Sequence, residues 1–464
     1  MAMPVVLYSF ISFMAVIILV SFRQHRQRTS MLPPGPPGYP LIGHLLQMPT
    51  KDPALVFHEW SKTYGPVMLL KVLGRSMIIL DSHQAAVDLL DKKGAIYSDR
   101  PKFKLYELLG WTSSLTFLQY GEKFNKHRQM HQTYLSRSKA EDFKPIQTQE
   151  ARTLVQHLIE SPREKYEKLM SRFATAGHRI SSGDDPYLRM SNMVYDVFIK
   201  TGPPGRSPLD FFPLLQHLPP WFPGAKHVGM VQTWRSTVRE LHDYPVRMVK
   251  AQRASTLEHG EASPSFVLEH LERMEEGDDE DDLKGAAATM FAAGEATTWT
   301  TLSIFILAMI LHPECQAKAQ KEIDSVVGDL RLPEFGDRGS LPFVEGILQE
   351  TLRAYRRVTD ILEGVPHRAM ENNVYNGMLI PKGAVILANI RICTGQYVAD
   401  NSLWIAIASI LATCTITNVL DESGQIIIPE RTMTEGPGRH PTDIRCVISP
   451  RSPRAKTLIL EAAV

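Results

Sequence analysis

Residues 283–311 read LKGAAATMFAAGEATTWTTLSIFILAMIL, and this stretch decides which kind of fold the chain can adopt. It is apolar on most faces, which is typical of a helix inside a protein core or of a membrane span. Gly294, Glu295 and several threonines interrupt it, and the almost wholly apolar part, Leu302–Leu311, is too short to cross a bilayer. We therefore expect a buried helix through the middle of a large domain.

Around this helix the chain is predicted to be mainly α-helical with a smaller β region. Helical patterns dominate from about 138 to 354, and short strands are predicted at Val67–Val72 and Ser76–Leu80. The acidic run Glu275–Asp282 is predicted to be a solvated loop. Because there is no internal repeat and no clear inter-domain linker, residues 51–464 are expected to form one domain.

The N-terminal 30 residues predict a membrane anchor. Pro4–Phe22 carries no charge over nineteen residues, close to the length that spans a bilayer. Three arginines within residues 23–28 follow at once and favour a cytoplasmic position for the rest of the chain. The alternative, a cleaved signal peptide, would carry its charge before the apolar stretch and a small-residue cleavage site after it. Residues 31–50 are predicted to be a hinge, stiffened by five prolines within Leu32–Pro40.

Composition limits the class of function. A formal net charge of +1 and the lack of a long basic stripe argue against a nucleic-acid partner. The four cysteines show no paired spacing, which argues against a disulfide framework and against a Cys-x-x-Cys metal site.

A basic pattern occurs at Gly121–Arg128 on a predicted helix. One face of this helix suits carboxylate ligands, with a solvated face as the alternative. The cations of this face are Lys123, Lys126, His127 and Arg128.

A polar pattern, Ala292–Thr298, lies inside the central apolar helix, where polar groups need partners or water. One interpretation is that the helix opens locally beside a ligand. Thr297 would then hydrogen-bond the ligand and relay protons, with Glu295 or water behind it. The alternative is that the threonines bond back to carbonyls of the preceding turn.

Glu350 and Arg353 lie three residues apart on one face of a further predicted helix. Apolar neighbours such as Leu348 and Leu352 favour partial burial, and a buried pair would be a structural clamp rather than a catalytic group. As a surface pair it would matter little.

Cys393 is the cysteine best placed to react. It lies within Arg391-Ile-Cys-Thr-Gly395, before a helical run at Leu403–Ile416. Arg391, the loop amides near Gly395 and the N-terminus of the following helix can keep a thiolate ionised. The other cysteines are expected to be inert, Cys315 and Cys414 in helical runs and Cys446 in a strand.

In this order the patterns resemble the cytochrome P-450 family over nearly the whole chain. The segments LPFVEGILQETLR (341–353) and ADNSLWIAIASILAT (399–413) look like fungal, particularly basidiomycete, members. The resemblance implies a haem b cofactor with Cys393 as the axial ligand to iron. It further implies that the haem propionates are held by Arg128, His127 and Arg368. Thr297 would be the oxygen-activating threonine, and Glu350 with Arg353 the core clamp.

The resemblance also implies the reaction and the partners. One oxygen atom from dioxygen would enter a small hydrophobic substrate, in secondary metabolism or xenobiotic oxidation, with electrons from NADPH through an NADPH-cytochrome P-450 reductase. The chain would be a single-pass protein of the endoplasmic reticulum membrane with a cytoplasmic catalytic domain. Substrate-contacting loops are expected around Ser98–Phe117 and Pro203–Trp221, where apolar and aromatic residues dominate.

The chain departs from the family pattern in two helices. Phe124 replaces the usual tryptophan of the basic helix. In the central helix the family places an acid directly before the threonine, whereas here Ala296 stands there. Glu295 lies one residue earlier, about 100° around the helix.

The third departure is at the cysteine loop. Ile386 and Asn389 occupy the positions of a phenylalanine and a glycine, after a strand predicted across residues 379–390. Only 39 residues separate Arg353 from Cys393, about half the family's usual spacing. The segment called the meander is therefore expected to be missing near residue 390, and a smaller gap is expected near Ala176-Gly177.

These departures leave three alternatives to a working monooxygenase. The first is a catalytically impaired or non-functional membrane protein derived from the family. The second is a helical scaffold in which Cys393 only packs. The third is a member that rearranges peroxides, against which the retention of Thr297 argues.

Overall fold

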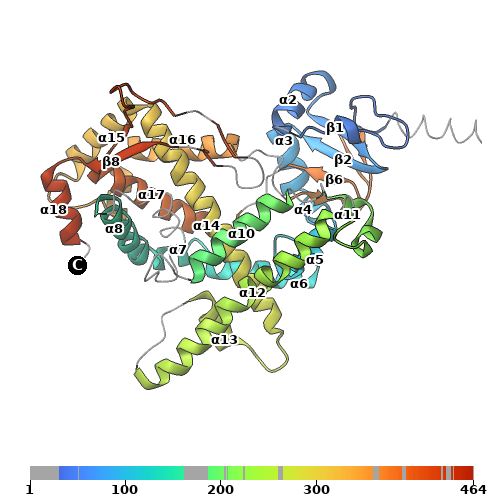
Figure 1. The fold of residues 1–464 in the computed structure, drawn as a ribbon, viewed down its shortest axis with the longest axis horizontal. Coiled ribbons are helices and arrows are strands. Elements are labelled where there is room, and N and C mark those ends of the chain that lie inside the picture. The colour runs from blue at the N-terminus through green and yellow to red at the C-terminus, as the bar shows by residue number, and fades with distance from the viewer. Residues whose placement is uncertain are drawn as a thin grey trace, which may run out of the picture. The chain divides into compact units, whose positions relative to one another are not determined.

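The computed structural model describes residues 31–50, 52–160, 186–202, 205, 207–222, 225–259, 265–358, 365–388, 393–429, 432–434, 440–442 and 444–462. They belong to two compact units, coloured along the chain in Figure 1. Unit 1 joins the N-terminal part up to Pro101 with Pro366–Ile390, and unit 2 contains Lys102–Val365 and Arg391–Val464. The predicted anchor and the predicted gap at Ala176-Gly177 lie outside the described residues.

Unit 1 is built on a four-stranded sheet in the order β1-β2-β6-β3. The two predicted short strands are confirmed as β1 (Val67–Val72) and β2 (Arg75–Leu80), which pair as an antiparallel hairpin. Its two-residue turn has positive φ at both Leu73 (49°) and Gly74 (81°), which matches the twist of the flanking strands. β6 (Val385–Leu387) runs parallel to β2 and antiparallel to β3 (His367–Arg368). The short helices of unit 1 are η1 (Leu45–Gln47), α2 (Pro53–Tyr64), α3 (His83–Ala86), η2 (Val87–Asp91) and α4 (Gly94–Tyr97).

The prediction of one strand across residues 379–390 is wrong. β5 (Met378–Ile380) pairs with β4 (Asn373–Tyr375), and β6 follows only after a turn. Pro381 has no amide hydrogen for a ladder bond, and Gly383 adopts a φ of 81°, so the chain reverses between the two strands.

Unit 2 is mainly helical, as predicted, with one small sheet (Figure 1). In that sheet β7 (Cys414–Asn418) is antiparallel to β8 (Cys446–Pro450). The helices are α5 (Lys104–Leu109), η3 (Trp111–Ser113), α6 (Glu122–Tyr134), α7 (Lys139–Asp142), α8 (Lys144–Glu160), α10 (Pro186–Thr201), α11 (Pro208–Phe211), η4 (Pro213–His217), α12 (Lys226–His259), α13 (Phe266–Arg273), α14 (Glu280–Leu311), α15 (Pro313–Val326), η5 (Phe335–Ser340), α16 (Pro342–Val358), α17 (Gln396–Thr413) and α18 (Pro453–Ala462).

α14 is the predicted central helix, and its C-terminal half lies in the largest core cluster. Phe305 of α14 and Trp404 of α17 are both fully buried there, together with apolar residues of α8, α15 and α16. Among the residues that the structure describes, α14 is the one helix long and apolar enough to cross a membrane, but 67% of its most apolar window is buried inside the protein. This burial supports the prediction of a core helix.

Two predicted segment ends need correction. Glu275–Asp282 is not a loop throughout, because α14 begins at Glu280 and Asp282 is buried at 7% exposed. The run Leu403–Ile416 is not one helix either, because α17 ends at Thr413 and Cys414 begins β7. The alternating β-branched residues after Cys414 favour the strand, and β8 supplies its hydrogen-bonding partner.

Candidate functional site

Cys393 lies immediately before α17, and it is the exposed one of the four cysteines. A Cβ at Gly395, the N-cap of α17, would lie 3.9 Å from both Cys393 Sγ and Leu135 Cδ1, so the loop follows the end of α6 closely. Burial, in contrast, raises the pKa of the Cys414 thiol to about 11, which agrees with its expected inertness. Arg391 lies outside the described residues, and its contribution stays a prediction.

Arg128 on α6 interacts electrostatically with Cys393. Burial lowers the pKa of Arg128, and the electrostatic interaction with Cys393 opposes this shift. One turn earlier, Phe124 is 3% exposed and anchors the helix in the core. The structure thus brings together a thiol and a cation that are 265 positions apart in the sequence.

One narrow face of α14 is exposed in the middle of a mostly buried helix. Ala293, Gly294 and Thr297 form it, and a Cβ added at Gly294 would meet no atom within 4 Å. The helix does not open here as one interpretation required, because it is continuous from Glu280 to Leu311. Thr297 Oγ1 donates to the Ala293 carbonyl at 2.8 Å, so the back-bonding alternative is confirmed. Its oxygen keeps the capacity to accept a hydrogen bond.

Glu295 does not share this face. It is 8% exposed, whereas Thr297 is exposed, and two residues correspond to about 200° around a helix. In this structure the carboxylate therefore lies on the far side of α14 from the Thr297 hydroxyl. The structure does not bring the two groups together, and a proton-donating role of Glu295 stays a prediction.

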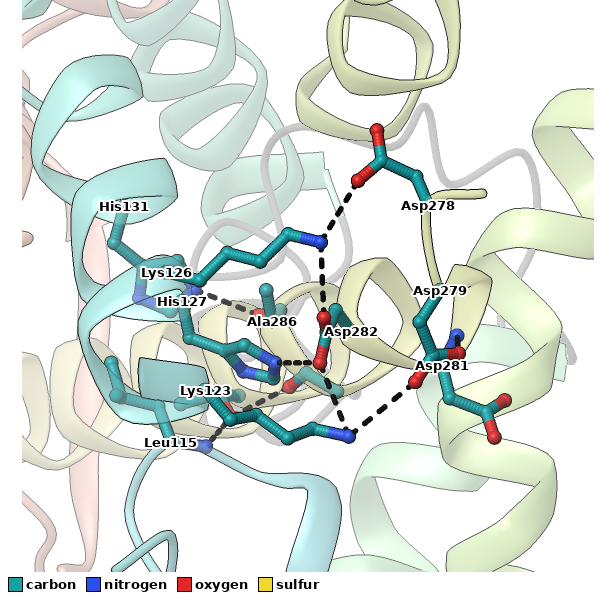
Figure 2. A network of polar contacts seen from close by, with 12 residues as sticks. Leu115, Lys123, Lys126, His127, His131, Asp278, Asp279, Asp281, Asp282 and Ala286 are labelled. Atoms are coloured by element: carbon teal, nitrogen blue, oxygen red, sulfur yellow. Dashed lines mark hydrogen bonds and ion pairs between the residues drawn. The ribbon is translucent and has the colours of Figure 1, made fainter. Parts of the chain in front are cut away.

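The other cations of the basic helix face the start of α14 (Figure 2). Lys123 Nζ and Lys126 Nζ each lie 3.1 Å from a carboxylate oxygen of Asp282, and His127 Nε2 lies 3.0 Å from Asp282 Oδ1. His127 is completely buried. His127 thus links α6 to α14 through Nε2, whereas its Nδ1 is buried without a hydrogen-bond partner among the described residues, so the expected propionate contact of His127 stays a prediction. Sequence reasoning did not identify Asp282 as a contact residue, because the acidic run that contains it resembles a solvated loop.

Glu350 and Arg353 interact on the surface of α16. Arg353 Nε donates to Glu350 Oε2 at 2.6 Å, and the side chains of Arg353 and Glu350 are 51% and 64% exposed. The expected partial burial is therefore wrong. Most of the 39 residues between Arg353 and Cys393 belong to unit 1, as the segment Pro366–Ile390 that contains β3–β6.

Arg368 lies in unit 1, on β3. Its Nε donates to Asp99 Oδ2 at 2.7 Å, and Asp99 is 4% exposed. The neighbouring Arg100 is 9% exposed and donates from Nη1 to the Pro366 carbonyl at 3.0 Å. Sequence reasoning missed Arg100, which is more deeply buried than Arg368, and the adjacent opposite charges of Asp99 and Arg100 were the available signal.

The segment expected to contact substrate at Ser98–Phe117 is partly helical and largely buried. It contains α5 and η3, and its aromatic rings pack in one cluster with α10, α12 and α14. The ring centroids of Tyr106 and Phe117 are 4.6 Å apart, and those of Trp111 and Phe198 are 4.8 Å apart. The surroundings of the N-terminal half of α14 are therefore aromatic and apolar.

Comparison with known proteins identifies the family. The model of the family described as cytochrome P450 matches residues 33–394. Cytochrome P450 monooxygenase 136 of Postia placenta is 35% identical over 94% of this chain and 92% of its own. Cytochrome P450 monooxygenase claR of Ampulloclitocybe clavipes is 33% identical over 96% and 91%. The chain belongs to the cytochrome P450 family, whose members are oxidoreductases with haem b as their cofactor.

The described residues of unit 2 fit a haem group. An iron ligand is present in the exposed thiol of Cys393, and thiolate is the ligand that defines this class. Arg128 supplies a cation beside that thiol, suited to a carboxylate or to the thiolate itself. The exposed face at Gly294 supplies an uncrowded helix surface.

Proposed function

We propose that the chain is a haem-thiolate monooxygenase that inserts one oxygen atom from dioxygen into a small hydrophobic organic substrate, in secondary metabolism or xenobiotic oxidation. The observation that carries this proposal is the exposed thiol of Cys393, set at the start of α17 and within electrostatic range of Arg128. Haem b, when bound, supplies the reductive activation of dioxygen.

The residues of this chain would bind and tune that group. The Cys393 sulfur would bind the haem iron, stabilised as a thiolate by Arg128, by Arg391 and by the N-terminus of α17. Arg128 and Arg368 would hold the propionates. The Thr297 hydroxyl would accept a hydrogen bond and pass a proton at Oγ1, next to the open surface of Gly294.

The substrate and the partners follow from the same proposal. The aromatic cluster around Trp111 and Phe117 suits a hydrophobic or aromatic small molecule. Electrons would come from NADPH through NADPH-cytochrome P-450 reductase. Residues 1–30 would anchor the protein in the endoplasmic reticulum membrane, with the catalytic domain on the cytoplasmic side.

An impaired member of the family is the second candidate, and two observations favour it. The alignments with the two relatives extend over 493 and 497 positions, longer than this chain of 464 residues, so each relative has residues without a counterpart here. The exposed Glu350–Arg353 pair is also what a missing covering segment would leave.

The carbon-monoxide difference spectrum of the dithionite-reduced protein tests the proposal. The full chain is expressed with its N-terminal segment in haem-supplemented microsomes, beside Cys393→Ala and the control Cys315→Ala. We expect a strongly red-shifted Soret band that Cys393→Ala alone abolishes, and substrate-dependent NADPH consumption once reductase is added. A red-shifted band without NADPH consumption would identify the impaired member, and peroxide turnover without NADPH the peroxide-rearranging one. The lack of any haem signal would refute the enzyme.

A further inference from the structure

α6 and α14 are joined by matched contacts one helical turn apart (Figure 2). His127 Nε2 lies 3.0 Å from Asp282 Oδ1, and His131 Nε2 donates to the Ala286 carbonyl at 2.9 Å. Residues four apart on α6 therefore meet residues four apart on α14. Because both histidines are buried, a slide of one helix along the other would leave two rings without partners. The contacts thus select one register.

Gly285 allows η3 and the His127 ring of α6 to approach α14 closely. A Cβ at this position would lie 2.0 Å from the Ser113 carbonyl oxygen and 3.0 Å from His127 Cε1. The imidazole of His127 therefore packs directly on the backbone of α14. Lys123 and Lys126, which are 41% and 42% exposed, reach the same Asp282 carboxylate from positions nearer to solvent.

Asp282 thus engages Lys123, Lys126 and His127, three of the four residues of the basic face, and the fourth, Arg128, interacts with Cys393. His127 and Arg128 are consecutive, about 100° apart around α6, so the contact that orients His127 also sets the direction of Arg128.

We propose that Asp282 is a positioning residue for the haem-thiolate site: by holding His127 it fixes the rotation and register of α6, and thereby the place of Arg128 beside Cys393. The inference rests on the proposed function for the role of Cys393 as a haem ligand. The place of residue 128 relative to Cys393 is nevertheless measurable in protein that contains no haem.

Cross-linking in the haem-free full chain tests this inference. Arg128→Cys is introduced, a short bis-maleimide bridges residue 128 to Cys393, and mass spectrometry quantifies the bridged peptides over time. We compare this variant with one that also carries Asp282→Asn, which keeps the side-chain shape and removes its charge. Because hydrogen bonds to charged groups hold buried helices in place, we expect the initial bridging rate to fall about tenfold.

Glu280→Gln is the matched control. Glu280 lies in the same first turn of α14 but pairs with Lys250 of α12, so bridging should keep its rate in this variant. His127→Phe removes the same contact from the α6 side and should slow bridging as Asp282→Asn does. His127→Gln, whose amide can still donate to Asp282, should restore the rate.

The outcomes separate the two proposals. Equal bridging rates with and without Asp282→Asn, in proteins that have the same circular dichroism, would overturn the inference, as would equal slowing by Glu280→Gln. If Asp282→Asn does not fold, the contrast between His127→Phe and His127→Gln decides in the same way. Suppose that residue 128 of the Arg128→Cys variant bridges rapidly to Cys393 while the protein without substitutions binds no haem. This result would refute the proposed function and leave the positioning by Asp282 intact.

Discussion

The ionic groups at the start of α14 and those on α16 differ in what surrounds them. Asp282 is 7% exposed and meets cations that come from another helix, α6. Glu350 and Arg353 meet each other within a single helix turn, and more than half of each side chain is exposed. Water can therefore solvate the second pair when it separates, whereas little water reaches the first.

This difference assigns the two groups different roles. An exposed ion pair contributes little, because each charge keeps its hydration and salt screens the attraction. A buried carboxylate and a buried imidazole cannot be hydrated in place of their contact. Loss of one partner therefore leaves the other desolvated and unpaired. The Asp282 contacts therefore join two helices, while the Glu350–Arg353 pair lies on the surface of one.

Asp282→Ala should produce the largest effect. It leaves the fully buried His127 without its partner, and we expect the free energy of unfolding to fall by about 3 kcal/mol. Urea unfolding of the detergent-solubilised chain, followed by circular dichroism, measures this value. Glu280→Ala, in the same helix turn and paired at the surface with Lys250, is the control with a small expected shift. Equal losses in the two variants would contradict the proposed difference between buried and exposed pairs.

The sequence predicted the elements that depend on local pattern. α14 was predicted from a long, mostly apolar stretch, and β1 and β2 were predicted as short strands. Cys393 stood out because its neighbours suit a thiolate, and it is the exposed cysteine. In each case residues close in sequence carry enough information, since helix and strand periodicity are local properties.

The ionic groups depend on contacts that no local pattern contains. His127 and Asp282 are 155 positions apart, and their pairing follows from the packing of α6 on α14. The acidic run Glu275–Asp282 was therefore predicted to be a solvated loop, although one of its carboxylates is buried. For Glu350 and Arg353 the apolar neighbours correctly indicated a packed helix, but the exposure of one face depends on what covers it, which the helix itself does not encode.

Acid pH should destabilise the folded protein through the buried His131, which belongs to the same contact between α6 and α14 as Asp282. Burial lowers the pKa of His131 to about 4, and the nearby charges of His127, His270 and Arg128 act in the same direction against the Ala286 carbonyl. The unfolded chain takes up this proton near pH 6.5, whereas the folded chain stays neutral down to about pH 4. Stability is therefore lost as the pH falls through this window, by about 3 kcal/mol in all.

His131→Gln isolates this contribution. Its amide can still donate to the Ala286 carbonyl but cannot take up a proton, so the loss of stability between pH 6.5 and 4 should be smaller than in the wild type. Urea unfolding at a series of pH values measures the two slopes. Asp282 does not interfere, because its pKa is held at about 2 and its contribution is lost only below about pH 4. Identical slopes would mean that His131 is protonated in the folded chain.

Glu350→Gln should have the smallest effect, although the family resemblance makes this pair a core clamp. Both side chains are already solvated, so we expect no shift in Tm beyond experimental error, in low or high salt. Arg338→Met is the matched comparison, because Arg338 is only 24% exposed and joins Glu345 of α16 to Asp400 of α17. That variant should lose about 1 to 2 kcal/mol, since it leaves two carboxylates without their shared cation. A large loss in Glu350→Gln would instead mean that the pair is covered in the folded protein. The two groups would then differ only in that Asp282 joins two helices whereas Glu350 and Arg353 lie on one helix, and not in their burial.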